Sequence, residues 1–65
     1  MKIYIFSKGK FTIKMSKDRR YYFVLQAPNG ETILTSETYQ SKQSAKKGIA
    51  AIQKYANAKV VDETF

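Results

Sequence analysis

The sequence predicts an α+β fold in which one helix packs against a three-stranded antiparallel sheet. Residues 11–16 alternate between apolar and polar side chains, which is the period of a half-buried strand. Two further segments rich in β-favouring residues, 21–27 and 32–37, flank a sequence typical of a tight turn. Residues 42–55 instead repeat apolar side chains at helical spacing. A last segment, 59–64, alternates weakly and is a candidate fourth strand.

The first two strands are expected to differ in burial. In the first, Phe11, Ile13 and Met15 share one side, and polar residues occupy the other. The second strand has apolar groups on both sides, since Phe23 and Val24 are neighbours in a run of aromatic and aliphatic residues. A strand that is apolar on both sides is expected in the centre of the sheet.

The turn between the second and third strands follows from three residues. Pro28 fixes φ for the first corner of a type I turn, and Asn29 suits the next position. Gly30 can take the positive φ that closes a three-to-five-residue hairpin with a bulge. Residues 32–37 are therefore predicted to return antiparallel to residues 21–27.

The helix is predicted to begin after Ser41, whose hydroxyl can accept an unpaired N–H of the first turn. Gly48 costs about 1 kcal/mol relative to Ala in mid-helix, so its presence indicates a close approach of the helix to the sheet. Asn57 can adopt the left-handed conformation that ends a helix. The face expected to be buried consists of Ala45, Ile49, Ile52 and Ala56.

The size of the chain predicts self-association. A single core below roughly 70–80 residues seldom stabilises a fold by more than a few kcal/mol, and a disulfide, a metal or an oligomer usually assists. The 65 residues include no Cys and no His, which removes disulfides and thiolate or imidazole metal sites. One helix also covers only one face of the sheet, and the other face would stay apolar and exposed. A homodimer is therefore expected, without a cofactor.

The motif in residues 29–49, N-G-E-x-I-L-x-S-E-x-Y-x-S-K-x-S-A-x-x-G-I, resembles the YegP-like family, small bacterial proteins of uncharacterised function. The resemblance covers residues 11–57. It implies a single β(3)-α-β domain over residues 11–64. Two such units, as tandem repeats or as two subunits, are implied to build one sheet and swap their last strands. This chain has one such unit, so the resemblance implies a homodimer in which residues 59–64 cross over. Residues 1–10 have no counterpart and are expected to be an N-terminal extension, with an edge strand as one possibility.

The hydroxyl and carboxylate side chains do not form a pattern typical of a catalytic site. A nucleophilic serine needs a base such as His or a Lys with a lowered pKa, and neither is predicted beside the hydroxyl residues Ser36, Thr38, Ser41 and Ser44. Glu31 and Glu37 lie at opposite ends of the third strand, about 20 Å apart when it is extended, too far for joint acid–base work. The expected function is a non-enzymatic homodimeric interaction or structural module.

The formal net charge of +7 suggests an alternative, electrostatic binding of nucleic acid or another polyanion without sequence specificity. Interleaved tyrosines would allow bases to stack, although no known nucleic-acid motif is present. The candidate contacts are Lys10, Lys14, Lys17, Arg19, Arg20, Lys42, Lys46 and Lys47. A protein partner is not indicated by any motif. No apolar run approaches the roughly 20 residues that span a bilayer, and a cytoplasmic location is expected.

Overall fold

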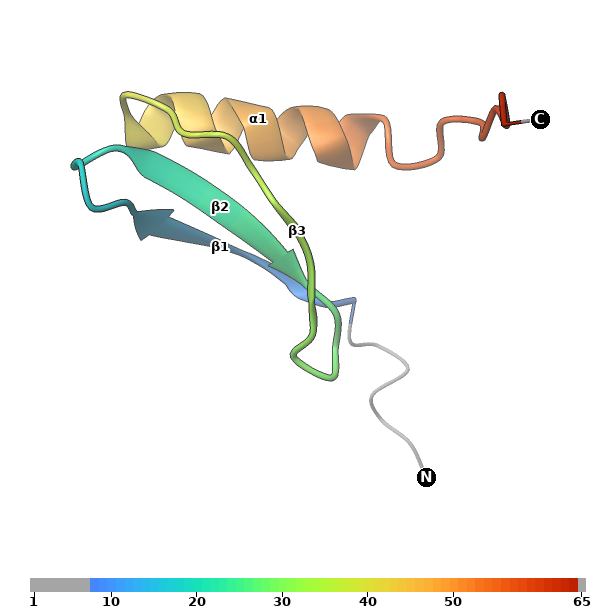
Figure 1. Cartoon of the computed structure of the whole chain (residues 1–65), viewed down its shortest axis with the longest axis horizontal. Coiled ribbons are helices and arrows are strands. Elements are labelled where there is room, and N and C mark those ends of the chain that lie inside the picture. Colours follow the sequence, from blue (N-terminus) through green and yellow to red (C-terminus); the bar gives the residue numbers. More distant parts are fainter. Residues whose placement is uncertain (1–7, 65) are drawn as a thin grey trace.

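The computed structural model describes residues 8–64, which form a three-stranded antiparallel sheet and one helix (Figure 1). The strands are β1 (Lys10–Met15), β2 (Tyr21–Gln26) and β3 (Thr32–Thr35), and the helix is α1 (Lys42–Lys54). The strand order is β1-β2-β3, so the prediction that the second strand is central is confirmed. The α+β class and the β-β-β-α order are confirmed with it.

The β1–β2 hairpin is regular from Lys10 opposite Gln26 to Met15 opposite Tyr21. It closes through a three-residue loop, where Ser16 N donates to the Arg20 carbonyl oxygen (2.8 Å) and Arg19 takes a φ of 65°. A type I turn followed by a left-handed residue is the usual form of such a loop. Here Arg19 fills a position that usually favours Gly.

The β2–β3 turn forms as the sequence predicts. Gly30 has a φ of 92°, its N–H donates to the Ala27 carbonyl oxygen (2.8 Å), and the Asn29 side chain accepts from Glu31 N (3.0 Å). The register shifts between Leu25 and Gln26, which is the expected bulge.

The third strand ends at Thr35, two residues before the predicted end. The backbone N–H of Phe23 donates to the hydroxyl of Ser36 (2.9 Å) instead of to a carbonyl of the ladder. The chain then leaves the sheet and returns only at an isolated bridge between Tyr21 and Tyr39. A side-chain acceptor has replaced a backbone acceptor, and this ends the regular ladder.

The core lies between α1 and the face of the sheet that carries Phe23. Phe23 is 1% exposed and Ala45, on the helix above it, is fully buried. Phe11 meets the Phe23 ring edge-on at 5.8 Å, and Tyr39 stacks on it at 6.0 Å. Gly48 lies directly over this aromatic group, so the close approach predicted from that glycine is confirmed.

The helix begins as predicted and ends differently. Ser41 is the N-cap, and its hydroxyl accepts from Ser44 N (3.0 Å). The last helical residue is Lys54, and the C-cap Tyr55 has a φ of −105°. Asn57 does not have a positive φ, so the left-handed stop expected there is wrong. Ala56 lies beyond the helix and is exposed, because the helix ends before its face can turn back onto the sheet.

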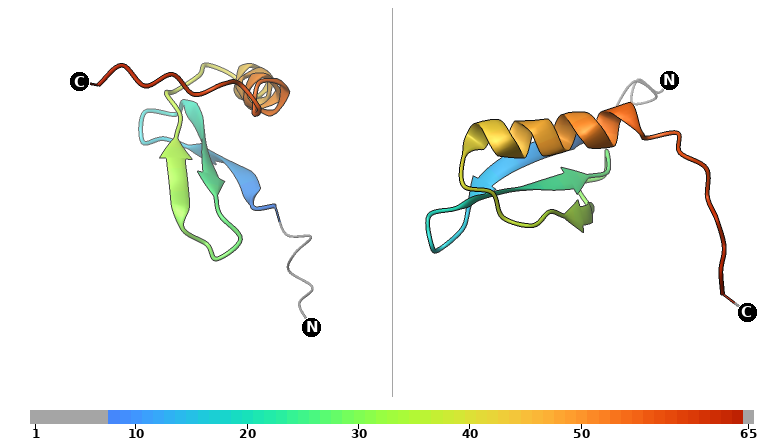
Figure 2. Two further views of the ribbon diagram at one scale, coloured as in Figure 1. Left: turned by 90° about the vertical axis from the view of Figure 1, so that its right-hand side faces the viewer. Right: turned by 90° about the horizontal axis from the view of Figure 1, so that it is seen from above.

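The chain after the helix extends away from the sheet (Figure 2). Residues 59–64, hereafter the tail, form no strand within this single chain, and Val60 is 93% exposed. The resemblance implied that this fourth strand pairs with a second copy. A single chain does not test that pairing, so it stays a prediction. At the other end, Lys10 belongs to β1, while residues 1–7 of the expected extension lie outside the described part of the chain.

The close approach at Gly48 predicts that Gly48→Ala destabilises the fold. The added Cβ would lie 2.5 Å from Tyr39 Oη and 3.2 Å from Phe23 Cε2. Overpacking of this kind costs about 1–3 kcal/mol, which exceeds the roughly 1 kcal/mol that Ala gains in a helix. We expect a lower free energy of unfolding in urea at fixed protein concentration.

Two variants control that experiment. Ala50→Gly, on the exposed side of α1, should lose about 1 kcal/mol through helix propensity alone. Tyr39→Phe removes the nearest oxygen and should reduce the penalty of Gly48→Ala in the double variant. A Gly48→Ala protein more stable than the parent would contradict the close approach.

Candidate interaction surface and basic residues

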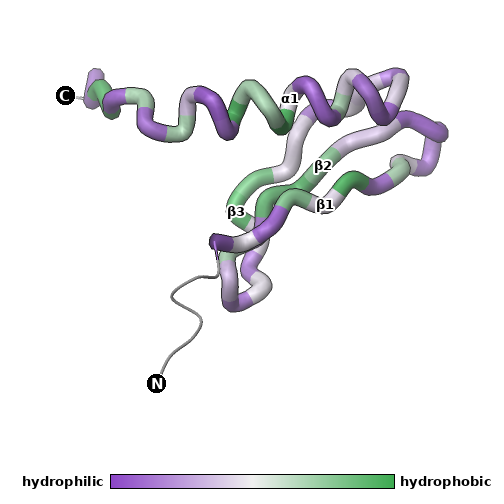
Figure 3. Tube along the Cα trace, turned by 180° about the vertical axis from the view of Figure 1, so that it is seen from behind, coloured by the Kyte–Doolittle hydropathy of each residue, from purple (hydrophilic) through white to green (hydrophobic). Residues whose placement is uncertain are grey.

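Helix α1 covers only part of the sheet. It packs on β1 and β2 and makes no contact with β3. Seen from behind, hydrophobic segments run along the strands beneath α1 (Figure 3). Several large apolar side chains stay exposed among the described residues: Met15 (55%), Ile33 (61%), Tyr55 (63%), Val60 (93%) and Val61 (63%). Two of the five lie in the tail.

A slot of about 370 Å³ opens between α1 and the start of β1. Ile49 and Gln53 form its helical side, and Phe11 and Leu25 form its sheet side. Lys8, Gly9 and Lys10 complete the lining. The slot is therefore apolar where helix and sheet meet, and residues 8–10 border it at the start of β1.

Gly9, directly before β1, is a second glycine whose backbone conformation and close contact matter, and this role was not predicted from the sequence. Its φ is 80°, and a Cβ there would lie 2.2 Å from the carbonyl oxygen of Gln26. Only Gly permits this approach. A second hollow of about 490 Å³ lies against the same backbone, lined by Gln26, Ala27, Pro28 and Gly30 together with residues 8–10. The sequence signal was a Gly directly before an alternating strand.

Among residues 8–64, no strand pairs with the outer edge of β1. Ser16 and Arg20 form a hydrogen-bonded pair, so alternate pairs along the hairpin toward Lys10 and Gln26 exchange bonds as well. The N–H and C=O groups of Phe11, Ile13 and Met15 consequently point away from β2. An exposed edge of this kind is a template for another strand.

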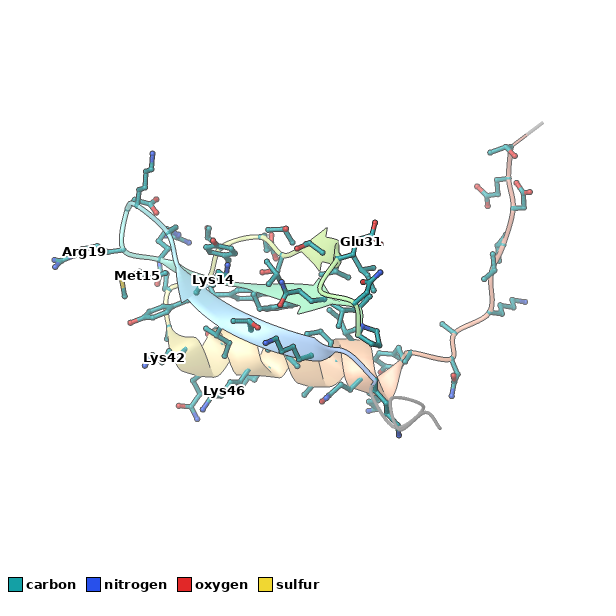
Figure 4. All side chains as sticks on the ribbon, turned by 90° about the horizontal axis from the view of Figure 1, so that it is seen from below. Lys14, Met15, Arg19, Glu31, Lys42 and Lys46 are labelled. Atoms are coloured by element: carbon teal, nitrogen blue, oxygen red, sulfur yellow. The ribbon has the colours of Figure 1, made fainter. Side chains whose placement is uncertain are left out.

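The predicted basic residues do not converge on one groove. Lys17 and Arg19 lie in the hairpin loop, and Arg20 Nε donates to Thr38 Oγ1 (3.0 Å). In Figure 4, Lys42 and Lys46 project from α1 on the side away from Glu31, and Arg19 projects from the hairpin tip. Lys10 and Lys14 do share a surface: both pair with β2 residues, Gln26 and Tyr22, on the sheet face opposite α1. Lys47 is an exposed residue of α1.

The hydroxyl side chains have structural partners. Ser41 caps α1 and donates to Ser44 Oγ (3.1 Å), and Ser36 donates to the Glu37 carbonyl oxygen (2.7 Å). Thr38 accepts from Arg20. Over residues 8–64, acidic side chains gather in no group of three that could hold a metal ion. The one helix of this described part is too short and too polar to cross a membrane.

The tail has local structure of its own. Asp62 Oδ1 accepts from Thr64 N (2.9 Å) and from Thr64 Oγ1 (2.6 Å). These two bonds stabilise the carboxylate and lower the pKa of Asp62. In the β1–β2 loop, the hydroxyl of Ser16 donates to Asp18 and lowers its pKa in the same way.

The Asp62–Thr64 contact predicts a measurable pKa change. In Thr64→Val the hydroxyl donor is lost, so the pKa of Asp62 should rise toward its ordinary value. Carboxyl carbon shifts followed by NMR across acid pH would measure it. Asp18 serves as the internal control and should keep its lowered pKa. The contact would be disproved by an Asp62 titration that is the same in both proteins.

Comparison with known proteins places the chain in a family. The family described as "Domain of unknown function (DUF1508)" matches residues 16–63. The UPF0339 protein YegP of Escherichia coli K12 is 58% identical over 45 residues, which are 69% of this chain and 41% of that protein. A UPF0339 protein of Acinetobacter baylyi is 56% identical over 46 residues, 71% of this chain and 41% of its own length.

A solved structure agrees with the fold. The solution structure of a protein from Haloferax volcanii aligns with a TM-score of 0.75 at 31% identity, and the alignment covers 88% of this chain and 97% of that one. The chain spans about two fifths of the length of the bacterial relatives that it matches. The resemblance inferred from residues 29–49 is thus confirmed. The chain belongs to the DUF1508 family of small YegP-like proteins, whose function is unknown.

Proposed function

We propose that this chain is a non-enzymatic module that acts as a homodimer, in which each copy donates its tail to the sheet of the other. The observation that carries the proposal is the tail itself. Val60 and Val61 are 93% and 63% exposed on a segment that leaves the body of the molecule. Burying an exposed valine side chain stabilises a fold by roughly 1.5–3 kcal/mol.

The small core supports the same proposal. Only Phe23, Val24 and Ala45 are buried apolar residues within the described part of the chain. Domains of this size usually need a disulfide, a metal or a second subunit. The sequence has no Cys and no His, so a second subunit is the available source of additional burial.

The lengths of the relatives are compatible with paired units. The 45 aligned residues are 41% of the Escherichia coli protein, so more than half of that protein lies outside the match. A second unit of similar length would fit in the remainder. In a dimer of this chain, a second subunit would take the place of that second unit.

The contacts of the hydroxyl groups support a non-enzymatic role. Ser41, Ser36 and Thr38 each serve a cap, a backbone bond or an arginine contact, and none is paired with a base. The module needs no oxidising compartment to fold, because the 65 residues contain no cysteine. A cytoplasmic setting is part of the proposal.

The dimer predicts that two substitutions in the tail separate the subunits. The chain has a mass of 7.5 kDa, and sedimentation equilibrium at micromolar concentration should give twice that value. Val60→Asp combined with Val61→Asp should weaken association at least a hundredfold, because two buried valines contribute about 3 kcal/mol. The urea midpoint should fall with it.

Lys59→Asp is the matched control, since it changes the net charge by the same two units without removing an apolar side chain. It should remain a dimer. A wild-type protein that sediments as a stable, folded monomer would refute the proposed function. Retention of the dimer by the double valine variant would show that the tail is not its basis.

A second candidate function, non-specific nucleic-acid binding, is favoured by one local observation. Lys14 lies directly opposite Tyr22, on the sheet face that α1 leaves uncovered, and Lys10 lies on the same face. A cation beside an aromatic ring on an open sheet is the arrangement that stacks and neutralises single strands. The separation of the other basic residues between hairpin tip and helix gives this candidate second place.

Binding to a single-stranded oligonucleotide tests this candidate. The affinity should fall steeply with salt, and Lys14→Gln should reduce the logarithmic salt slope by about 0.7 if Lys14 contacts a phosphate. Lys46→Gln, on the helix side, is the control and should leave the slope unchanged. No binding at about 50 mM salt would exclude the candidate.

A further inference from the structure

We propose that Asn29 is a site of spontaneous covalent modification, at which the side-chain amide is lost to give aspartate or isoaspartate when the β2–β3 turn opens. The inference goes beyond the proposed homodimer and does not depend on it. Three features carry it: the order of Asn29 and Gly30 in the chain, the hydrogen bonds of both reacting groups, and the absence of helix cover over β3.

The order of these two turn residues supplies the reacting groups. The backbone nitrogen of Gly30 attacks Cγ of Asn29, a new C–N bond closes a succinimide ring, and the side-chain amide leaves as ammonia with the proton from Gly30 N. Water then opens either carbonyl of the ring, which gives aspartate or isoaspartate. Gly30 has no side chain to hinder the attack. A Cβ at Gly30 would meet nothing within 4 Å, and both residues are exposed, so water reaches the turn.

The closed turn opposes the reaction. Gly30 N donates to the Ala27 carbonyl oxygen (2.8 Å), and the Asn29 side chain accepts from Glu31 N (3.0 Å). The nitrogen of the succinimide ring carries no hydrogen, so the bond from Gly30 to Ala27 has to break before the ring can close. The rate of the reaction should therefore follow the fraction of molecules in which the turn is open.

Opening of the turn does not require the core to unfold. β3 has four residues, a register shift beside the turn and no contact with α1. Leu34 is the one residue of β3 that is partly buried. A segment with so little burial opens at a lower free energy than the whole fold, while the contact of Phe23 with α1 stays in place.

The two products would affect the β2–β3 hairpin differently. Aspartate keeps the backbone unchanged, and its carboxylate can still accept from Glu31 N. Isoaspartate carries the backbone through its Cβ atom and so lengthens the chain between Ala27 and Glu31, whose bond from Ala27 N to the Glu31 carbonyl oxygen (2.8 Å) closes the loop. We therefore expect the isoaspartate form to pair β3 less well with β2.

Incubation of the full chain at mildly alkaline pH tests the proposal. Trypsin separates the two asparagines of the sequence, because Asn29 lies in the fragment 21–42 and Asn57 in the fragment 55–59. Mass spectrometry of each fragment measures the replacement of the amide by a hydroxyl group. Asn57 is the internal control, since it is also exposed but precedes Ala58, whose methyl group hinders the same attack. The same chain unfolded in guanidinium chloride gives the rate without a turn.

Two glycine substitutions distinguish opening of the turn from global unfolding. Thr35→Gly weakens β3 at an exposed position outside the turn, so the chemistry of Asn29 and Gly30 is unchanged. Ala50→Gly is the matched control, because it weakens α1 at an exposed position and leaves β3 intact. Far-ultraviolet circular dichroism checks that both variants are folded.

We expect the folded chain to convert Asn29 on the order of tenfold or more slowly than the unfolded chain, and Asn57 to remain unconverted over the same time. Thr35→Gly should raise the folded rate several-fold, and Ala50→Gly should leave it unchanged. Equal acceleration by both variants would show that the reaction follows global unfolding. That result overturns the proposal, as would a folded rate equal to the unfolded rate, no response to Thr35→Gly, or no conversion of Asn29 in the folded chain.

Discussion

The contact between α1 and the aromatic group on β2 holds the fold together. Phe23 is buried between Phe11 and the stacked ring of Tyr39, and Gly48 lets the helix backbone approach this group. A methyl group at position 48 would contact the side chains of Tyr39 and Phe23. Packing this tight allows little freedom in the height or position of the helix above the strands.

The position of the helix decides what stays exposed. Because α1 sits over β1 and β2, it leaves β3 without a helix and opens the slot at Ile49 and Gln53. The helix ends at Lys54, and the chain after it extends away from the sheet (Figure 2). In this single chain the tail forms no strand.

A module of this design would couple folding to association. Apolar side chains that a larger domain would bury internally stay exposed here, Val60 and Val61 of the tail among them. The total protein concentration would then affect the observed stability. The sheet face opposite α1, with Lys14 and Tyr22, is not covered by the helix.

The sequence by itself determined the local elements and their order. Alternation defined β1, a run of β-favouring residues defined β2, Pro28 to Gly30 defined the turn, and Ser41 defined the start of the helix. Each of these depends on the preferences of neighbouring residues. Gly48 also revealed a close contact, since its cost in a helix required a compensation. The family followed from a dense local motif.

Tertiary structure alone decided the features that depend on partners distant in the chain. β3 ends early because Ser36 bonds across to Phe23, and Tyr39 became part of the core because a single bridge to Tyr21 returns it to the sheet. The slot combines residues from β1, β2 and α1, and no local pattern in any of the three indicates it. Ala56 had the right spacing for burial, yet the helix stopped before the chain reached it, because end geometry is set by packing and not by periodicity.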